Sequence, residues 1–247
     1  MSATILKTRG FLLILLGLLM SLSACSSEEP IDSLKRSLDK YPEYSIVLND
    51  MKEEGDLLTD YYHRYKLVYG EPVQGKPDSV FYKTEFTDWQ QVPESYYKDN
   101  ANYLGMVLAS KTRDGKISDD KFPPGYQYVG DQRYGQWRQN SDGTSFWEFY
   151  GKYALMSQVF GLLSGSVNRN DWGMYNDYRT RRQPYFGTSG QYGTFGSSTQ
   201  KSNPSFFERR QVKQQASRSN FLNKFKTRVS RGSTSPARSR SFGGFGK

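Results

Sequence analysis

The sequence predicts an α+β fold: an antiparallel sheet of about four to five strands, with an N-terminal and a C-terminal helix, followed by a largely disordered tail. Segments with apolar residues at alternate positions indicate half-buried strands. Aromatic residues at intervals of three and four near residue 150 indicate a buried helix. From residue 166 on, aliphatic residues become scarce, which favours disorder over a packed core.

The elements are predicted in chain order from these patterns. A first helix is expected over residues 44–52, because Ile46, Val47 and Met51 fall on one helical stripe. Two half-buried strands follow at 61–69 and 80–87, where side chains alternate between apolar and polar faces. The glycine-containing segment between them ends the first strand.

A third strand over residues 103–112 is apolar on both faces, so it is expected to lie inside the sheet. The Asp114-Gly115 pair after it is typical of a tight hairpin turn. Further short strands are expected at 126–129 and 134–138. The body closes with a helix at 146–163, where aromatic and aliphatic residues cover most of the circumference.

Charge divides the chain at about residue 165. Residues 26–165 carry 16 Lys and Arg against 22 Asp and Glu, whereas residues 166–247 carry 16 against 3. Such asymmetry is typical of a globular domain with a basic interaction tail. The predicted organisation is residues 1–24 as a signal peptide, 25–42 as a lipidated tether, 43–165 as the globular domain and 166–247 as the tail.

The N-terminus has the pattern of an export signal. Lys7 and Arg9 precede an apolar run over residues 10–20. A membrane-spanning helix needs about 20 apolar residues, so this run is too short to remain in a bilayer as a span. A short apolar region after a basic start is typical of a secretory signal peptide.

The residues that follow, Leu22-Ser23-Ala24-Cys25, contain the only cysteine of the chain. This arrangement resembles the bacterial lipoprotein signal peptide, whose motif of Leu, two small residues and Cys is cleaved before the Cys. The resemblance covers residues 1–25 alone. It implies that Cys25 is acylated, with fatty acids such as palmitate, and anchors the protein in the cell envelope. If the host has two membranes, the lack of an Asp after Cys25 resembles the pattern for the outer membrane.

One segment of the tail is predicted to form a helix, over residues 206–229. Ser205 and Glu208 have the spacing of a capping box. Apolar residues then recur at intervals of four, and basic residues surround them: Arg209, Arg210, Lys213, Arg218, Lys224, Lys226 and Arg228. Basic amphipathic helices bind anionic membrane surfaces or partner grooves. A solvated, partly helical tail is the alternative that the pattern leaves open.

The first strand carries a row of aromatic residues around the only histidine of the chain: Tyr61, His63, Tyr65 and Tyr69. If exposed, this row lines a groove in which rings stack on a ligand; if buried, it fills the core. The second interpretation is the ordinary one for a lone histidine on a tyrosine-rich face.

Known catalytic and cofactor motifs are missing from the sequence. One Cys and one His exclude a disulfide framework and a Cys/His zinc site. The acidic pairs lack the ligand spacing of a calcium loop, and there is no nucleophile elbow, P-loop or dinucleotide fingerprint. We therefore predict no catalytic residues, no metal and no cofactor, and we regard an enzyme as improbable.

Three classes of function remain, and we favour a lipid-anchored envelope protein that acts by binding. Its basic tail is expected to contact anionic lipid headgroups, lipopolysaccharide or cell-wall polymer, and its body a protein partner that the sequence does not identify. The alternative is a structural or assembly protein that self-associates through its aromatic and arginine residues. An envelope hydrolase ranks third, and nucleic acid is not an expected partner because the protein is predicted to be exported.

Overall fold

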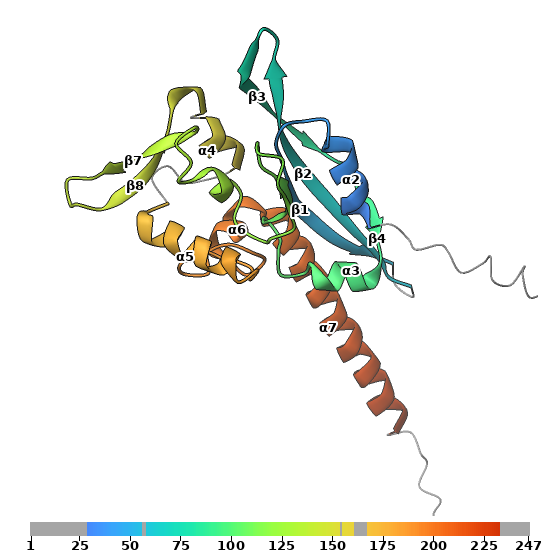
Figure 1. Ribbon diagram of the computed structural model, residues 1–247. Coiled ribbons are helices and arrows are strands. Elements are labelled where there is room, and N and C mark those ends of the chain that lie inside the picture. The colour runs from blue at the N-terminus through green and yellow to red at the C-terminus, as the bar shows by residue number, and fades with distance from the viewer. Residues whose placement is uncertain (1–28, 56–57, 154, 161–166, 233–247) are drawn as a thin grey trace, which may run out of the picture.

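The computed structural model describes residues 29–55, 58–153, 155–160 and 167–232, and has an α+β fold with an antiparallel sheet covered on both faces (Figure 1). The predicted signal peptide, Cys25 and the last fifteen residues lie outside this range. The predicted class and antiparallel pairing are confirmed. The main sheet has six strands, one more than the upper end of the prediction.

The sheet runs in the order β3-β2-β1-β5-β6, and β4 pairs with the first half of β2. Its central strands are long: β1 pairs with β2 along its whole length, from Tyr44 opposite Tyr69 to Glu54 opposite Asp60. The strands are β1 (Tyr44–Glu54), β2 (Asp60–Val73), β3 (Lys76–Phe86), β4 (Gln90–Val92), β5 (Val107–Lys111) and β6 (Ile117–Ser118).

The segment predicted as the first helix, 44–52, is strand β1, so that prediction is wrong. Ile46 and Leu48 are buried on one face of the sheet, while Val47 is buried on the other. A strand covered on both faces has a nearly continuous apolar sequence, which hides the period of two. By contrast, the predicted strand at 61–69 lies within β2, the one at 80–87 matches the second half of β3, and the inner strand predicted at 103–112 contains β5.

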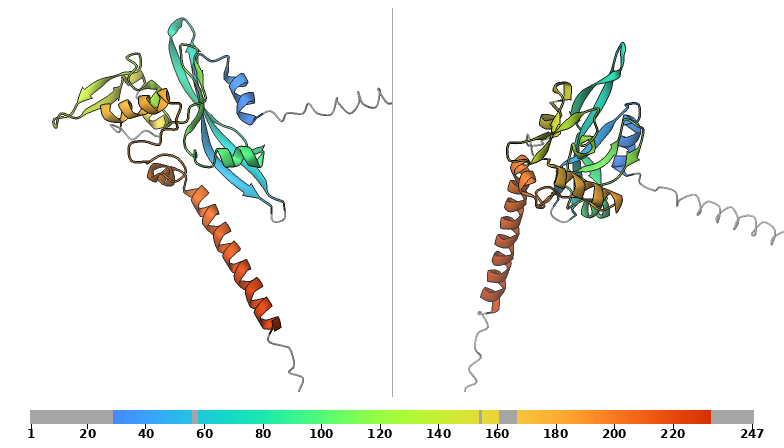
Figure 2. Two further views of the ribbon diagram at one scale, coloured as in Figure 1. Left: turned by 60° about the horizontal axis from the view of Figure 1, so that its bottom comes forward. Right: turned by 60° about the vertical axis from the view of Figure 1, so that its left-hand side comes forward.

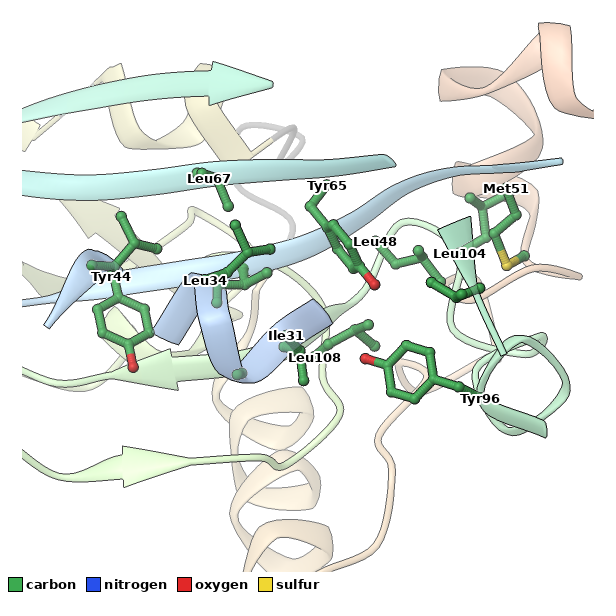
Figure 3. Close-up of a cluster of buried hydrophobic side chains, with 14 of the residues drawn as sticks. Ile31, Leu34, Tyr44, Leu48, Met51, Tyr65, Leu67, Tyr96, Leu104 and Leu108 are labelled. Carbon is green, nitrogen blue, oxygen red and sulfur yellow. The ribbon is translucent and has the colours of Figure 1, made fainter. Parts of the chain in front are cut away.

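Two helices cover the first face of the sheet (Figure 1). Helix α2 (Pro30–Leu38) buries Ile31, Leu34 and Leu38, which share one stripe, and helix α3 (Glu94–Asp99) buries two tyrosines. Figure 3 shows how the aliphatic side chains of α2, β1 and β5 gather with Tyr65 and Tyr96 into one cluster. This cluster also contains Phe206, from far along the chain.

The second face is covered by short elements: η1 (Tyr126–Tyr128), the hairpin of β7 (Gly135–Gln139) and β8 (Ser145–Phe149), η2 (Gly151–Tyr153), α4 (Leu155–Phe160) and α5 (Arg169–Thr180). The strand predicted at 134–138 matches β7. The strand predicted at 126–129 is wrong, because it forms a 3-10 turn. The helix predicted at 146–163 is also wrong over its first residues, because Phe146–Phe149 belong to strand β8. Residues 161–163 lie outside the described range.

The predicted boundary at residue 165 does not end the packed structure. Tyr175 and Tyr185 are 2% exposed and belong to the same buried cluster as Val68 of the sheet. After α5 come α6 (Ser197–Ser202) and α7 (Pro204–Gly232). The prediction of a largely disordered tail is therefore not confirmed over residues 167–232, because tyrosine rings provide the buried area that aliphatic residues would otherwise supply.

Buried carboxylates hold this second layer in place. Asp171, in the first turn of α5, is 2% exposed and accepts hydrogen bonds from the hydroxyls of Tyr126 (2.5 Å), Tyr185 and Thr188 (2.5 Å). Hydrogen bonds to an ionised acceptor are worth more than neutral ones, so they offset the cost of removing the carboxylate from water. Asp171 thereby fastens the chain beyond residue 180 to the body.

Glu43, just before β1, is fully buried and is held in the same manner. It accepts hydrogen bonds from Tyr82 of β3 and Tyr134 beside β7, each at 2.8 Å. Loss of water around the carboxyl raises the pKa of Glu43 above its usual value. This side chain is therefore one of the links between the main sheet and the second layer.

Replacing Asp171 by Ala is expected to destabilise the protein by about 2–3 kcal/mol, because the buried hydroxyls of Tyr126 and Tyr185 lose their acceptor, each at a cost of about 1–3 kcal/mol, while the exposed Thr188 can turn to water. Urea unfolding followed by circular dichroism measures the change. The matched control is Asp177→Ala on the same helix, whose side chain is 73% exposed and should cost no more than about 0.5 kcal/mol. Equal effects of the two substitutions would contradict the role of Asp171.

Candidate functional site: the basic helix α7

Helix α7 begins at Pro204 and ends at Gly232, so the helix predicted over 206–229 is present. A helix of 29 residues is about 43 Å long at 1.5 Å per residue. Its first residue is a proline, which suits the first turn because its amide is not needed there. Ser205 lies inside the helix, so it is not the cap that the sequence predicted.

The first turns of α7 pack against the sheet and the remainder extends away from the body (Figures 1 and 2). Phe206 is 7% exposed and sits in the cluster beneath α2 and α3. All residues from 208 to 224 are exposed. The helix is thus anchored at one end and open to a partner over most of its length.

Two ion pairs fix the base of α7 to β1. Arg209 contacts Asp50 at 2.5 Å, and Lys213 contacts Glu53 at 2.5 Å. The guanidinium of Arg209 also lies 5.9 Å from the centre of the Trp89 ring. These pairs are partly exposed, so each contributes little to stability, but together with Phe206 they set the direction in which the helix leaves the body.

The seven basic residues predicted to bind an anionic surface therefore divide into two groups. Arg209 and Lys213 are paired with carboxylates, and Arg210 lies 5.8 Å from the centre of the Phe195 ring. Arg218, Lys224 and Lys226 are exposed along the projecting part. Arg228 belongs to the same part of α7, although its side chain is not described.

Apolar side chains accompany the outer cations. Phe221 is 67% exposed and Leu222 is 54% exposed, and the sequence places Phe225 and Val229 four and eight residues after Phe221. Residues at these intervals share one face of a helix. Exposed aromatic and aliphatic residues beside lysines are the pattern of a helix that lies in a membrane interface. None of the helices in the described ranges has the length and hydropathy of a membrane span.

The aromatic row predicted around His63 is not a groove. His63 and Tyr65 are fully buried, and the His63 ring lies 5.5 and 5.3 Å from the rings of Tyr96 and Tyr97 on α3. His63 Nδ1 and the Tyr65 hydroxyl are 3.2 Å apart. These residues fill the core between the sheet and α3, so the ordinary interpretation of the lone histidine applies.

The other two members of the row lie at its edges. Tyr61 is half-buried and donates to Glu94 at 3.2 Å. Tyr69 is 3% exposed, donates to Glu85 and stacks on Tyr41 with ring centres 4.1 Å apart. Because His63 and Tyr65 are fully buried between these two residues, the four predicted residues do not form one open binding site.

In the part of the chain that the structure describes, no cluster of three or more Cys, His, Asp or Glu side chains is placed to hold a metal ion. Cys25, the predicted lipidation site, lies outside the described residues. The candidate site is therefore α7 together with its base on β1.

Comparison with protein-family models, with curated proteins and with solved structures gives no significant match for this chain.

The burial of His63 predicts a pH dependence of stability. Loss of water lowers its pKa from 6.5 to about 4 in the folded protein. Between these values the unfolded chain binds a proton that the folded chain does not, so stability falls as the pH drops from about 6.5 to 4. A shift of this size corresponds to about 3 kcal/mol at 1.36 kcal/mol per pKa unit.

The His63→Gln variant isolates this contribution, because glutamine remains uncharged across the range. Urea unfolding at several pH values is expected to show that the difference in free energy between wild type and variant changes by about 3 kcal/mol from pH 7 to pH 4. A difference that stays constant over this range would contradict the burial of a neutral imidazole.

Proposed function

We propose that this protein is a lipid-anchored protein of the bacterial cell envelope that acts by binding, and that α7 is the arm with which it contacts an anionic membrane surface or cell-wall polymer. The observation that carries the proposal is the projecting half of α7, where exposed cations and exposed Phe221 and Leu222 occur together. No catalytic step is part of the proposal.

Electrostatics favour an anionic partner. The 29 residues of α7 contain eight Lys and Arg against one Glu. Two of the eight are paired with Asp50 and Glu53 at the base of the helix, so the excess charge lies in the projecting part. Each Lys or Arg close to an anionic membrane contributes about 1 kcal/mol of attraction at physiological ionic strength. Four such residues give about 4 kcal/mol, which is sufficient for weak, salt-sensitive contact with the surface.

The predicted anchor and the arm are close enough to act together. A fully extended chain covers at most about 3.6 Å per residue, so the four residues from Cys25 to Glu29 span no more than about 14 Å. Ile31, at the start of α2, and Phe206, at the base of α7, belong to one buried cluster on the same face of the sheet. An acylated Cys25 would hold the body near the bilayer, and α7, about 43 Å long, can reach its surface.

Acylation would also supply the stable part of the attachment. One acyl chain gives marginal membrane binding, whereas two chains, or one chain and a basic patch, give lasting anchorage. In this proposal the lipids on Cys25 keep the protein attached to the membrane, and α7 determines which surface the body faces. The outer membrane is the proposed location where the host has two membranes.

The binding role of α7 predicts the behaviour of a soluble form that carries Cys25→Ser. Replacing Arg218, Lys224, Lys226 and Arg228 by Gln is expected to weaken binding to vesicles of phosphatidylglycerol and phosphatidylcholine at least 100-fold, since each cation is worth about 1 kcal/mol. Co-sedimentation at 0.1 M salt measures the affinity. Wild type should also lose affinity as the salt concentration rises, because mobile ions screen the attraction.

The matched control removes four cations elsewhere: Lys40, Lys98, Arg138 and Arg181, all replaced by Gln. These residues are exposed and lie outside α7, so the variant has the same net charge as the α7 variant. It should bind the vesicles within about threefold of wild type. Equal losses for the two variants would mean that overall charge, and not α7, determines binding.

The anchor itself is tested by mass spectrometry of the protein purified from bacterial membranes. The expected N-terminal peptide begins at Cys25 and carries the mass of a diacylglycerol group. Cys25→Ser should move the protein from the membrane fraction to the soluble fraction. Recovery of an intact Met1, or of an unmodified Cys25 thiol in a membrane-bound protein, would contradict the lipoprotein assignment.

Self-association is the alternative function, and the exposed Phe221 and Leu222 are the observation that favours it. Two copies of α7 could bury these residues against each other. The strong positive charge of each helix opposes such pairing, so we rank it second. Analytical ultracentrifugation of the soluble form distinguishes the two functions: a monomer at micromolar concentration supports surface binding, and a dimer abolished by Phe221→Ser and Leu222→Ser supports assembly.

A further inference from the structure

Strand β3 lies at the edge of the main sheet. It pairs with β2, and in the part of the chain that the structure describes no further strand follows it on its outer side. Figure 1 shows the hairpin of β2 and β3 extending beyond α2. A long, uncovered sheet edge is a template for pairing with a strand of another chain. We propose that this edge pairs with β3 of a second copy of the protein.

The hydrogen bonds of the ladder show which backbone groups of β3 point outward. The amide of Thr87, next to the end of β3, donates to the carbonyl of Tyr65 in β2 at 2.9 Å. Thr87 therefore faces β2, and so do the odd-numbered residues before it, because bonding alternates along an antiparallel strand. The amides and carbonyls of Tyr82, Thr84 and Phe86 point away from β2. Nothing within the described ranges pairs with them.

The side chains along this edge are open to solvent. Phe81 is 60% exposed and Phe86 is 53% exposed, and Lys83, Thr84 and Glu85 are exposed as well. Residues 80–86 are mostly β-branched or aromatic and contain no proline, so their sequence favours strand pairing. The edge thus combines unpaired backbone groups with uncovered rings.

One symmetric register fits a second copy. Two β3 strands can run antiparallel with Thr84 opposite the second copy's Thr84, so that the outward backbone groups of each strand bond to the other. Lys83 then lies opposite the second copy's Glu85, and Tyr82 lies opposite the second copy's Phe86. The twofold axis repeats each of these pairs. Opposite charges and aromatic rings at facing positions stabilise an antiparallel pair.

Charge complementarity selects this register over its neighbours. The outward backbone groups alternate, so the centre of the pair can move only in steps of two residues, to Tyr82 or to Phe86. Lys83 would then face Phe81 or Trp89 and would meet no carboxylate. Only the register centred on Thr84 places an opposite charge in front of Lys83.

Lys83 and Glu85 have partners within one copy, and these partners leave room for the new contact. Lys83 pairs with Glu71 at 2.8 Å, with 45% of its side chain exposed, and Glu85 accepts from the Tyr69 hydroxyl. An ammonium group has three donors, and a carboxylate accepts about four hydrogen bonds. In the paired state Lys83 would lie between Glu71 and the second copy's Glu85.

The contact is small. Residues 80–86 on each side are far fewer than the about 20–30 residues per side of a standard stable interface. The soluble form is therefore expected to be monomeric at micromolar concentration and to pair at millimolar concentration.

Confinement to a membrane would favour the pair, a step that rests on the proposed function, whereas the pairing itself does not. Side chains at facing positions of an antiparallel pair project to the same face. The first faces of the two sheets therefore lie on the same side, and α2, the helix nearest to the predicted anchor, covers that face in each copy. Two copies anchored through Cys25 would meet at a high effective concentration.

Disulfide trapping tests the pairing in the soluble Cys25→Ser form, since Cys25 is the only cysteine of the chain. Facing residues in a hydrogen-bonded antiparallel pair have Cα atoms about 5.5 Å apart, within the range of a disulfide. With Thr84→Cys added, mild oxidation at millimolar protein concentration is expected to yield a covalent dimer, measured by non-reducing electrophoresis.

The matched control is Phe86→Cys, on the same strand and the same face and equally exposed to solvent. In the proposed register the two Cα atoms at position 86 lie about 14 Å apart, too far for a disulfide. This variant should form the dimer at least tenfold more slowly than Thr84→Cys.

Exchange of charge tests the Lys83 contact in the Thr84→Cys background. Lys83→Glu places like charges opposite each other and should slow the trapping at least tenfold. The double substitution Lys83→Glu and Glu85→Lys restores opposite charges and should return the rate to within about threefold. Thermal unfolding checks each fold, and Glu85→Lys alone replaces Lys83→Glu if that variant does not fold.

Three results would overturn the inference: no covalent dimer of Thr84→Cys at millimolar concentration, equal trapping rates of Thr84→Cys and Phe86→Cys, or a charge exchange that does not restore the rate. Binding of the reduced variants to phosphatidylglycerol vesicles is measured separately. It depends on α7 and not on β3, so failure of the pairing is distinct from failure of the proposed function.

Discussion

The structure depends on carboxylates that are buried among hydroxyl groups. Asp171 accepts from Tyr126, Tyr185 and Thr188, and Glu43 accepts from Tyr82 and Tyr134. An isolated charge in this position would cost several kcal/mol, and the multiple hydrogen bonds offset that cost. Because these bonds join segments far apart in the sequence, they hold the sheet and the tyrosine-rich second layer together as one globular unit.

The packing of aromatic residues determines where the globular part of the chain ends. Residues 167–203 pack on the body through Tyr175 and Tyr185, and Phe206 packs into the buried cluster on the opposite face of the sheet. From residue 214 to the end of α7 the sequence is rich in cations, glutamines, asparagines and serines, and its large apolar residues are few: Phe221, Leu222, Phe225 and Val229. Such a helix cannot be buried against the body, so it projects and presents its charge to a partner.

The sequence predicted the features that depend on local pattern. Alternation predicted strands β2 and β3, the Asp-Gly pair predicted the turn after β5, and apolar residues at intervals of four predicted α7. It failed where tertiary packing overrides pattern: β1 is buried on both faces and has no visible alternation, and the aromatic spacing from Phe146 on belongs to a strand and two short helical turns. Asp171 gave no signal, because its three partners converge on it only after folding.

Hydrogen–deuterium exchange of the soluble form, with and without anionic vesicles, examines the globule and the helix in one experiment. Amides of β1, β2 and α5 should be protected to a similar degree in both conditions, because they belong to one cooperative unit. Amides of α7 from residue 218 to 232 should exchange rapidly in solution and become protected only when phosphatidylglycerol vesicles are present. Rapid exchange throughout α5, or unchanged exchange of α7 in protein that has bound the vesicles, would contradict the account.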